Sequence, residues 1–553
     1  MDLNLHYMLP LLVFVLYGSP ALTHHHQYST LPSTDADRLQ NPNNAKENEN
    51  DYWYANAKEH LNKKLKQQAQ LNCKRAKNVI LFLGDGMSMQ TVTATRVFLG
   101  DTAHQLAFDK FPYIGLSKTY CVDKQVPDAG SSATAFLSGV KANYGTIGVN
   151  AQVQRSDCAL GQHNEHHTES IAKWAQDAGK WAGLVTTARV THSTPAGVYA
   201  HTSDRDWEHD GKIIKSGCNP KEVIDLARQL VEWPVGKALR VILGGGRRSF
   251  LNETTHDEEG EHGHRSDGRN LIEEWLSDKH QIDAHAAYVS NKQELHQAQH
   301  DKVDYLLGLF SSSHCPYHSE LEHDELHKTV PSLSEMTEAA IKLLSRNDEG
   351  YFLFVEGAKI DMAHHDNKAR KSLEETAEFS RAVELARTLT SDEDTLIVVT
   401  ADHAQTMTIN GYPKRSDDIL GLGSDKGLDG LPYTILSYAN GPGYDNTYAA
   451  KKGRKDWSKE NFKDSKLKYM ATVPLEMGTH GGDDVGIFAS GPFAHYFSGN
   501  YEQSYIPLLM AKAAAIGPYA NNISWLETRT LKLCCNDNNK IEKIYIKKTK
   551  KTK

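Results

Sequence analysis

Short apolar runs alternate with amphipathic stretches from Lys77 onward, and this alternation predicts a layered α/β structure. The runs are apolar throughout, as in strands that are buried between two layers of helices. We predict strands at Asn78–Leu83, Ala182–Thr187, Arg240–Leu243, Tyr351–Val355 and Thr395–Thr400. Helices are predicted between them, for example at Glu169–Ala178, Leu333–Leu344 and Leu373–Arg387. The fold class is therefore α/β, with a doubly wound, mostly parallel central sheet and helices on both faces.

Carboxylates come at or just after the ends of three predicted strands. They are Asp85, Glu356 and Asp402, which lie one to three residues past the apolar runs. In a parallel sheet the carboxyl ends of the strands share one edge, and functional residues gather in the crevice beyond that edge. The strand pattern thus predicts that these three side chains share one site.

Candidate metal ligands occur in four short segments of the chain. They are Asp85, Glu356, Asp361, His365, Asp402, His403 and His480. No cysteine belongs to the set, and oxygen and imidazole ligands without thiolates suit catalytic Zn²⁺ and Mg²⁺ better than structural zinc. The set predicts metal-assisted hydrolysis.

The spacing of these residues suggests two zinc sites. Asp361 and His365 are four residues apart and share one face if the segment is helical, so they can bind one ion together with His480. A second ion can be held by Asp85, Asp402 and His403. Two such ions about 4 Å apart clamp both ends of an in-line phosphoryl displacement. Each segment alone is also explained as a helix cap or a core pair; their joint occurrence favours the metal site.

Two further residues are candidates for a magnesium site. His192 and Thr194 follow the predicted strand at 182–187, and a hard octahedral ion accepts a threonine oxygen together with Glu356. The Ser-Thr-Pro sequence there is equally an ordinary helix start. Arg205 can hold two phosphoryl oxygens, although a surface ion pair is the simpler explanation for that residue alone.

The composition describes a soluble globular protein. Its 553 residues carry a net charge of −8, which gives no electrostatic reason to bind nucleic acid. Seven cysteines leave at least one unpaired within a monomer, and a few disulfides on a large core suit an oxidising compartment. Two glycosylation sequons begin at Asn252 and Asn522, in agreement with secretion.

The ends of the chain predict processing and extensions. Residues 1–23 resemble a signal peptide, although a short membrane anchor also fits, and no membrane span is expected in the mature chain. Residues 24–50 are polar and are expected to be disordered, and 51–71 have the composition of a helical arm. Residues 411–470 interrupt the strand pattern as an inserted subdomain. The basic tail at 525–553 lacks the apolar segment of a GPI signal, so we expect a secreted protein.

Several motifs together resemble the animal (insect-like) alkaline phosphatases. They run in order from about residue 51 to 521: Gly84-Asp85-Gly86-Met87, Val185-Thr186-Thr187-Ala188-Arg189-Val190, Leu243-Gly244-Gly245-Gly246-Arg247, Val355-Glu356-Gly357, Thr400-Ala401-Asp402-His403 and Thr479-His480-Gly481-Gly482.

The resemblance implies a homodimeric phosphomonoesterase with two Zn²⁺ and one Mg²⁺ per subunit, acting on phosphate monoester substrates. It implies a first zinc site of Asp361, His365 and His480, and a second of Asp85, Asp402 and His403. The implied magnesium ligands are Asp85, His192, Thr194 and Glu356, and Arg205 is implied to bind the phosphoryl group. It also implies a disulfide between Cys158 and Cys218, a partner-embracing arm at 51–71, a crown at 411–470 and a catalytic domain at 74–521. The acidic segment 258–267 can bind Ca²⁺, as the animal enzymes do nearby, although an acidic solvated loop explains it equally well.

The nucleophile is the exception to the resemblance. The family has a serine directly after the aspartate of this motif, and here the segment reads Pro127-Asp128-Ala129-Gly130-Ser131. A methyl group at Ala129 cannot attack phosphorus. Ser131 can take over if the loop shifts, the metal ions can activate water directly, or the chain can be an inactive paralogue that binds metal and phosphate. A relationship to sulfatases or phosphoglycerate mutases is disfavoured, because this chain lacks the motif order of those families.

Overall fold

The computed structural model describes residues 46, 50–69, 71–449 and 453–520, in two units that divide after Gln70. In the first unit, residues 50–69 form the helix α3 (Asn50–Ala69), where the sequence predicts a helical arm. Its side chains Trp53, Tyr54, Leu61 and Leu65 are all more than half exposed. The predicted signal peptide, most of the polar segment 24–50 and the basic tail lie outside the described residues.

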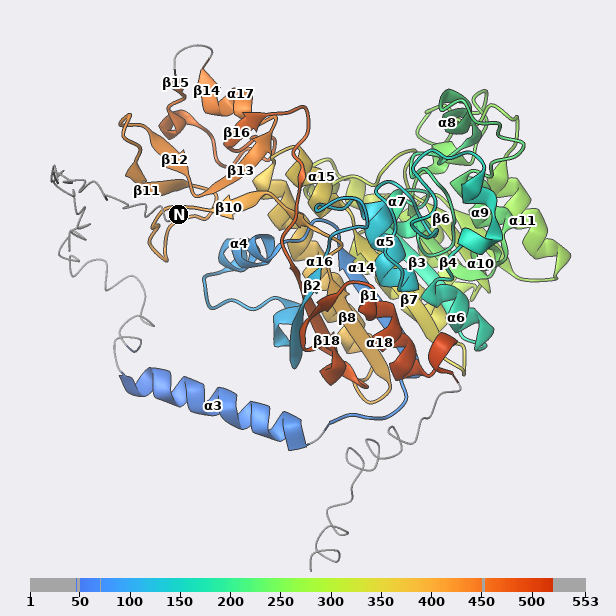
Figure 1. Ribbon diagram of the computed structural model, residues 1–553, viewed down its shortest axis with the longest axis horizontal. Helices are drawn as coiled ribbons and strands as arrows, with labels where there is room; N and C mark the ends of the chain where they lie inside the picture. Colours follow the sequence, from blue (N-terminus) through green and yellow to red (C-terminus); the bar gives the residue numbers. More distant parts are fainter. Residues whose placement is uncertain (1–45, 47–49, 70, 450–452, 521–553) are drawn as a thin grey trace, which may run out of the picture. The chain divides into compact units, whose positions relative to one another are not determined.

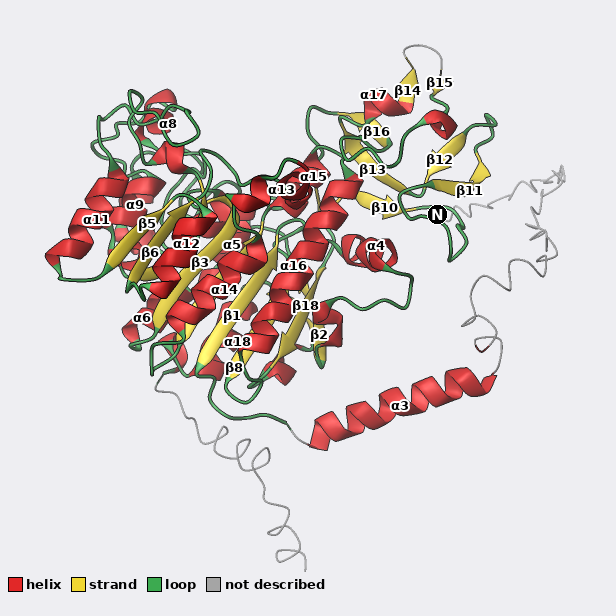
Figure 2. Ribbon diagram, turned by 180° about the vertical axis from the view of Figure 1, so that it is seen from behind, coloured by secondary structure: helices red, strands yellow, loops and turns green. Residues whose placement is uncertain are grey.

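A ten-stranded sheet forms the centre of the second unit (Figure 2). Its strands are, in spatial order, β19 (Gly499–Glu502), β2 (Tyr113–Lys118), β18 (Val485–Ser490), β8 (Thr395–Thr400), β1 (Asn78–Gly84), β7 (Tyr351–Gly357), β3 (Trp181–Arg189), β4 (Leu239–Gly245), β6 (Tyr305–Leu309) and β5 (Ala286–Val289). Strand β18 runs antiparallel to both of its neighbours, and the remaining pairs are parallel. The predicted doubly wound α/β class is confirmed.

Helices cover both faces of this sheet because successive residues of each strand point to opposite sides. In β1, Val79 and Leu81 join one core cluster, whereas Ile80 and Phe82 join another. The first cluster includes residues of α5 (Ala129–Ser138), α6 (Ile171–Asp177), α9 (Leu226–Glu232), α11 (Leu271–Gln281) and α18 (Tyr505–Ala514). The second includes residues of α4 (Met89–Leu99), α12 (Lys292–His300), α14 (Leu333–Leu344) and α16 (Ala369–Leu389).

The segment predicted as a crown has small sheets of its own (Figure 1, orange). Strands β10 (Met407–Ile409), β13 (Leu436–Gly441) and β16 (Ala471–Pro474) form one sheet. Two hairpin-like pairs join β11 (Leu422–Lys426) to β12 (Pro432–Thr434) and β14 (Tyr448–Ala449) to β15 (Gly453–Arg454). Tyr438, Trp457 and Tyr469 are buried in a third core cluster, which also includes Leu373 of α16.

The cysteines and the character of the helices are two further features of the described chain. Cys158 and Cys218 form the expected disulfide, while Cys73, Cys121 and Cys315 carry thiols. Within the described ranges, no helix combines the length and the apolar character that crossing a membrane requires.

Candidate active site

The candidate ligands meet at the carboxyl ends of the central strands. Strand β1 pairs in parallel with β7 and β8, and this register sets Leu83 opposite both Glu356 and Thr400. Asp85 follows β1, Glu356 lies near the end of β7, and Asp402 follows β8. All three side chains are almost completely buried. Three segments that lie far apart in the sequence therefore deliver carboxylates to one place.

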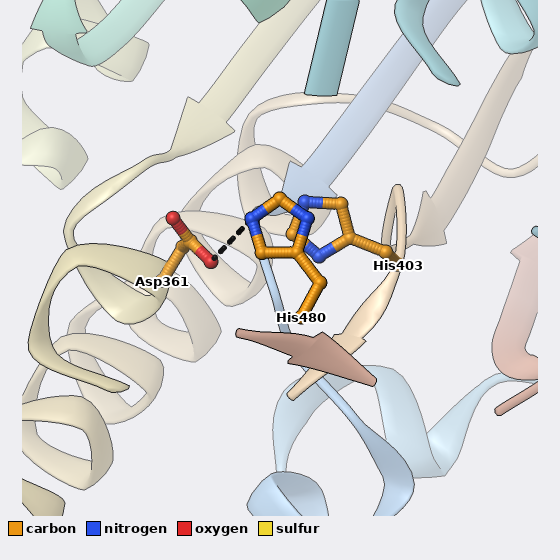
Figure 3. Close-up of side chains that lie close together, drawn as sticks. All are labelled: Asp361, His403 and His480. Atoms are coloured by element: carbon orange, nitrogen blue, oxygen red, sulfur yellow. Dashed lines mark ion pairs between the residues drawn. The ribbon is translucent and has the colours of Figure 1, made fainter. Parts of the chain in front are cut away.

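Asp361, His365 and His480 form the first cluster. Helix α15 (Lys359–His365) places His365 Nε2 3.0 Å from Asp361 Oδ2. His480, on the short strand β17 (His480–Gly481), lies with its Nε2 3.1 Å from His365 Nε2 and 3.8 Å from Asp361 Oδ1. Figure 3 shows the Asp361 carboxylate beside the His480 ring. Asp361 and His365 therefore share one face of a helix, as their i, i+4 spacing predicts.

The tautomers of the two histidines suit a cation. His365 Nδ1 donates to the Gly478 carbonyl, and His480 Nδ1 donates to the Pro127 carbonyl at 2.8 Å. In the neutral rings both Nε2 atoms then present lone pairs to each other, which is the arrangement that a bound cation stabilises. Burial opposes a charge on His365, but the Asp361 carboxylate outweighs it and raises the pKa of His365 to about 9.

Asp85, Asp402 and His403 form the second cluster. His403 Nε2 lies 3.0 Å from Asp402 Oδ2 and 3.5 Å from Asp85 Oδ1. The His403 ring also stacks on His480, with ring centroids 3.5 Å apart, so the two clusters are adjacent (Figure 3). The candidate ligand atoms of Asp85, Asp402 and His403 lie within 4.8 Å of one another, and so do those of Asp361, His403 and His480.

The predicted magnesium residues lie beside the second cluster. Helix α7 (Ser193–Ala196) begins after His192 and carries Thr194. Thr186 Oγ1 donates to Glu356 Oε2 at 2.5 Å, whereas Glu356 Oε1, Asp85 Oδ1 and His192 Nδ1 are buried and have no hydrogen-bond partner among the described residues. Buried polar atoms without partners are costly, and a cation ligated by them removes that cost.

The electrostatics of the site also require positive charge. Burial raises the pKa of Asp85 well above its usual range, and the carboxylates of Asp361, Asp402 and Glu356 raise it further. Burial likewise raises the pKa of Glu356 to about 8, against hydrogen bonds from threonine hydroxyls. Several buried carboxylates so close together are stable in their ionised form only beside cations. The donor set therefore fits hard and borderline metal ions.

Asp128 connects the nucleophile position to Arg205. Asp128 is the N-cap of helix α5, whose first residue is Ala129, and its side chain accepts hydrogen bonds from the N–H groups of Gly130 and Ser131. Arg205 Nη1 donates to Asp128 Oδ2 at 2.8 Å, and this ion pair is partly buried, with Asp128 fully enclosed. Asp128 was not singled out as a site residue from the sequence, although its place before Ala129 was the available signal.

Ser131 lies close to Ala129 in sequence but faces Asp128. Its hydroxyl donates to Asp128 Oδ1 at 2.7 Å and lies 3.1 Å from the Asp128 carbonyl oxygen, and the residue is 1% exposed. Ser131 Oγ is thus engaged in closing the first turn of α5. Gln405, which the sequence reasoning missed, donates through Nε2 to Asp361 Oδ1 and orients that ligand. Its place two residues after His403 was the signal that could have found it.

The acidic segment considered for Ca²⁺ is largely paired with a buried arginine. Arg247 Nη1 lies 2.6 Å from Glu258 Oε2 and 3.3 Å from Asp257 Oδ2, and its Nη2 lies 3.4 Å from Glu259 Oε1. Asp267 is paired with Arg265. Within the described ranges, the segment contributes to neither group of three or more converging ligands. A guanidinium already supplies the positive charge that these carboxylates need.

Comparisons with known proteins agree with this geometry. The family model described as alkaline phosphatase matches residues 76–516. The membrane-bound alkaline phosphatase of Bombyx mori is 45% identical over 86% of this chain and 87% of its own length. The tissue-nonspecific isozyme of Gallus gallus is 44% identical over 86% of this chain and 91% of its own length.

A solved structure shares the fold. A variant of the TAB5 alkaline phosphatase with Mg bound matches with a TM-score of 0.56 and 21% identity, over 80% of this chain and 99% of that one. The family match spans every strand of the central sheet, the ligand segments and the segment between β10 and β16. The chain belongs to the alkaline phosphatase family, a family of metal-dependent phosphomonoesterases.

Proposed function

We propose that this protein hydrolyses phosphate monoesters at a site of two Zn²⁺ and one Mg²⁺, with water in place of the serine nucleophile. The observation that carries the proposal is the cluster of buried carboxylates and largely buried histidines, next to a helix that begins with Ala129. In this proposal Asp361, His365 and His480 hold the first zinc, and Asp85, Asp402 and His403 hold the second. The magnesium ligands are Asp85, His192, Thr194 and Glu356.

Bound metal ions would neutralise charge on the phosphoryl oxygens and lower the pKa of a bound water to about 7. Arg205 binds the phosphoryl group in the proposed site. Asp128 engages only Nη1, and Nη2 makes no hydrogen bond within the part of the chain that the structure describes. The guanidinium is therefore held in place by one side and keeps donors for phosphoryl oxygens on the other. Burial strengthens this interaction because few water molecules compete for the donors.

Water is favoured over Ser131 as the nucleophile. To attack, Ser131 Oγ would have to leave Asp128, and the first turn of α5 would have to open. A methyl side chain at Ala129 leaves space for a water molecule where the serine hydroxyl of the family would stand. This reaction is expected to be slower than covalent catalysis, which divides one difficult step into two easier ones.

The second candidate function is binding without turnover, and the observation that favours it is Ala129 itself. An inactive paralogue would keep the same ligands and bind metal and phosphate or a partner protein. Metal content does not distinguish the two functions, whereas turnover does.

The test is hydrolysis of p-nitrophenyl phosphate at mildly alkaline pH by the metal-loaded protein and by Ala129→Ser and Ser131→Ala variants. EDTA-sensitive turnover that survives in Ser131→Ala supports water as the nucleophile. Turnover that is lost in Ser131→Ala, in a protein that still folds and binds metal, assigns the attack to Ser131. Turnover in Ala129→Ser alone identifies the natural chain as a binder, and inactivity of all variants rejects the catalytic assignment.

We also propose that the protein is secreted after removal of residues 1–23 and acts as a homodimer. The disulfide between Cys158 and Cys218 supports export, because such bonds persist in oxidising compartments. The arm at 51–71, the catalytic domain at 74–521 and the crown at 411–470 are parts of the same proposal. Size-exclusion chromatography with light scattering tests the dimer, and N-terminal sequencing of the exported protein tests the cleavage.

A further inference from the structure

A second cavity lies apart from the ligand cluster. It has a volume of about 330 Å³ and is lined by His167–Ser170 before α6, by Gly197–His201 and by Trp233–Val235 at the start of α10 (Pro234–Lys237). Figure 1 shows α6 and α10 on the same side of the sheet. None of the proposed metal ligands lines it. The volume is in the range of sites for small molecules.

Three aromatic rings form part of its wall. His167 and His201 are stacked nearly parallel, with centroids 4.2 Å apart and an interplanar angle of 3°. The ring centroid of Trp233 lies 5.8 Å from that of His167 and 5.7 Å from that of His201, and its plane is tilted by 35° and 34° to theirs. Trp233 is only partly buried, so part of this large aromatic surface remains accessible.

The two histidines present hydrogen-bond acceptors. His167 Nε2 donates to the Gly161 carbonyl at 3.0 Å, and His201 Nδ1 donates to the Gly148 carbonyl at 2.7 Å. Because a carbonyl only accepts, these contacts fix the tautomers and leave a lone pair on His167 Nδ1 and on His201 Nε2. Burial lowers the pKa of His201 to about 4 and also lowers that of His167, so both rings are neutral at pH 7.

The remaining polar groups restrict the ligand further. Thr168 is 8% exposed, and its hydroxyl has no hydrogen-bond partner among the described residues. Lys173 is neutralised by Asp177, with both carboxylate oxygens at 2.5 Å from Nζ. Glu169 is exposed at the rim. The cavity therefore offers aromatic surface and acceptors but no buried, unpaired charge.

We propose that this cavity binds a neutral, planar aromatic molecule that carries a hydrogen-bond donor, of the indole or phenol class. The ring packs against Trp233 and the apolar side chains of Val198 and Val235, and the donor meets a histidine nitrogen or Thr168. The three aromatic rings favour a flat aromatic ligand, and the fixed histidine tautomers favour a ligand that donates a hydrogen bond. The site is separate from the proposed catalytic function and does not depend on it.

The test is binding of indole to the metal-loaded, full-length protein by isothermal titration, with 1-methylindole as the matched probe that lacks the N–H. We expect a saturable Kd of about 1 mM or lower for indole. Loss of one hydrogen bond makes 1-methylindole about fivefold weaker. Trp233→Leu is expected to weaken indole at least tenfold, whereas Trp53→Leu, on α3, is the control that leaves it unchanged.

Three results would overturn the proposal: no saturable binding of indole, equal binding of both probes, or equal affinity in Trp233→Leu and Trp53→Leu. Thermal unfolding shows whether Trp233→Leu remains folded. If it does not, Val235→Phe, which fills the mouth of the cavity, replaces it. Indole binding that persists unchanged in a folded Val235→Phe protein likewise rejects the site.

Discussion

Replacing Asp128 by asparagine is expected to destabilise the protein, although the two side chains have almost the same shape. The carboxylate accepts from Ser131 N, Ser131 Oγ and Gly145 N at Oδ1, and from Gly130 N and Arg205 Nη1 at Oδ2. An asparagine must put its NH₂ group at one of these two positions. Either choice makes it face at least two donors.

The magnitude follows from the less costly choice, with NH₂ in place of Oδ2. The N-cap contact with Gly130 is worth about 1 kcal/mol. The charge-assisted bond to Arg205 is worth about 1.5–3 kcal/mol. The sum is about 3 kcal/mol. The family match at residues 76–516 spans about 440 residues, for which the unfolding entropy is about 0.9 kcal/mol/K, so Tm falls by about 3 °C.

The assay is thermal and urea unfolding of the EDTA-treated protein between pH 3 and pH 8. Burial alone would raise the pKa of Asp128, but the charge of Arg205 and the hydrogen bonds from Ser131 and Gly145 outweigh it and lower the pKa. A carboxyl with a lowered folded pKa stabilises above its unfolded pKa of about 3.9, and this contribution is lost as the pH falls through the folded value.

The difference between wild type and Asp128→Asn is therefore constant at pH 6–8 and begins to shrink as the pH falls below about 3.9. The matched control is Asp206→Asn, because Asp206 is exposed and its pair with Arg155 lies at the surface. Its expected effect is below about 1 kcal/mol. Equal Tm values for Asp128→Asn and wild type at pH 7, or a difference that does not change with pH, would refute the assignment of a charged, five-bond N-cap.

Three further outcomes are expected. Asp85→Asn lowers the Tm of the metal-loaded protein but raises that of the EDTA-treated protein at pH 8, since it removes one of the mutually repelling buried carboxylates; a loss in both states contradicts this explanation. Cys158→Ser opens the loop that Cys218 closes, 60 residues long, and costs about 4 kcal/mol in urea unfolding, whereas a cost below 1 kcal/mol means that the loop is ordered without the bond. Glu208→Gln breaks the buried two-bond pair with Arg189 and costs about 3 kcal/mol; an unchanged urea midpoint shows that the pair contributes nothing.

The sequence by itself determined the fold class, five of the ten strands of the central sheet and the set of candidate ligand residues. Strand β1 is apolar on both faces because its alternate residues enter two different cores. The strand can therefore be predicted from its own residues. Asp361 and His365 share a helix, so their spacing alone brings them together. The absence of a hydroxyl at Ala129 is equally a property of the sequence.

The tertiary structure decided which distant residues meet and how their side chains are engaged. Strand order sets β1 between β7 and β8, and only this order joins Asp85, Glu356 and Asp402. The pairing of Arg247 with the acidic segment depends on where the loops pack. The stacked pair of His167 and His201 arises in the same way. These contacts are non-local, and no periodicity along the chain encodes them, because they follow from packing across the whole domain.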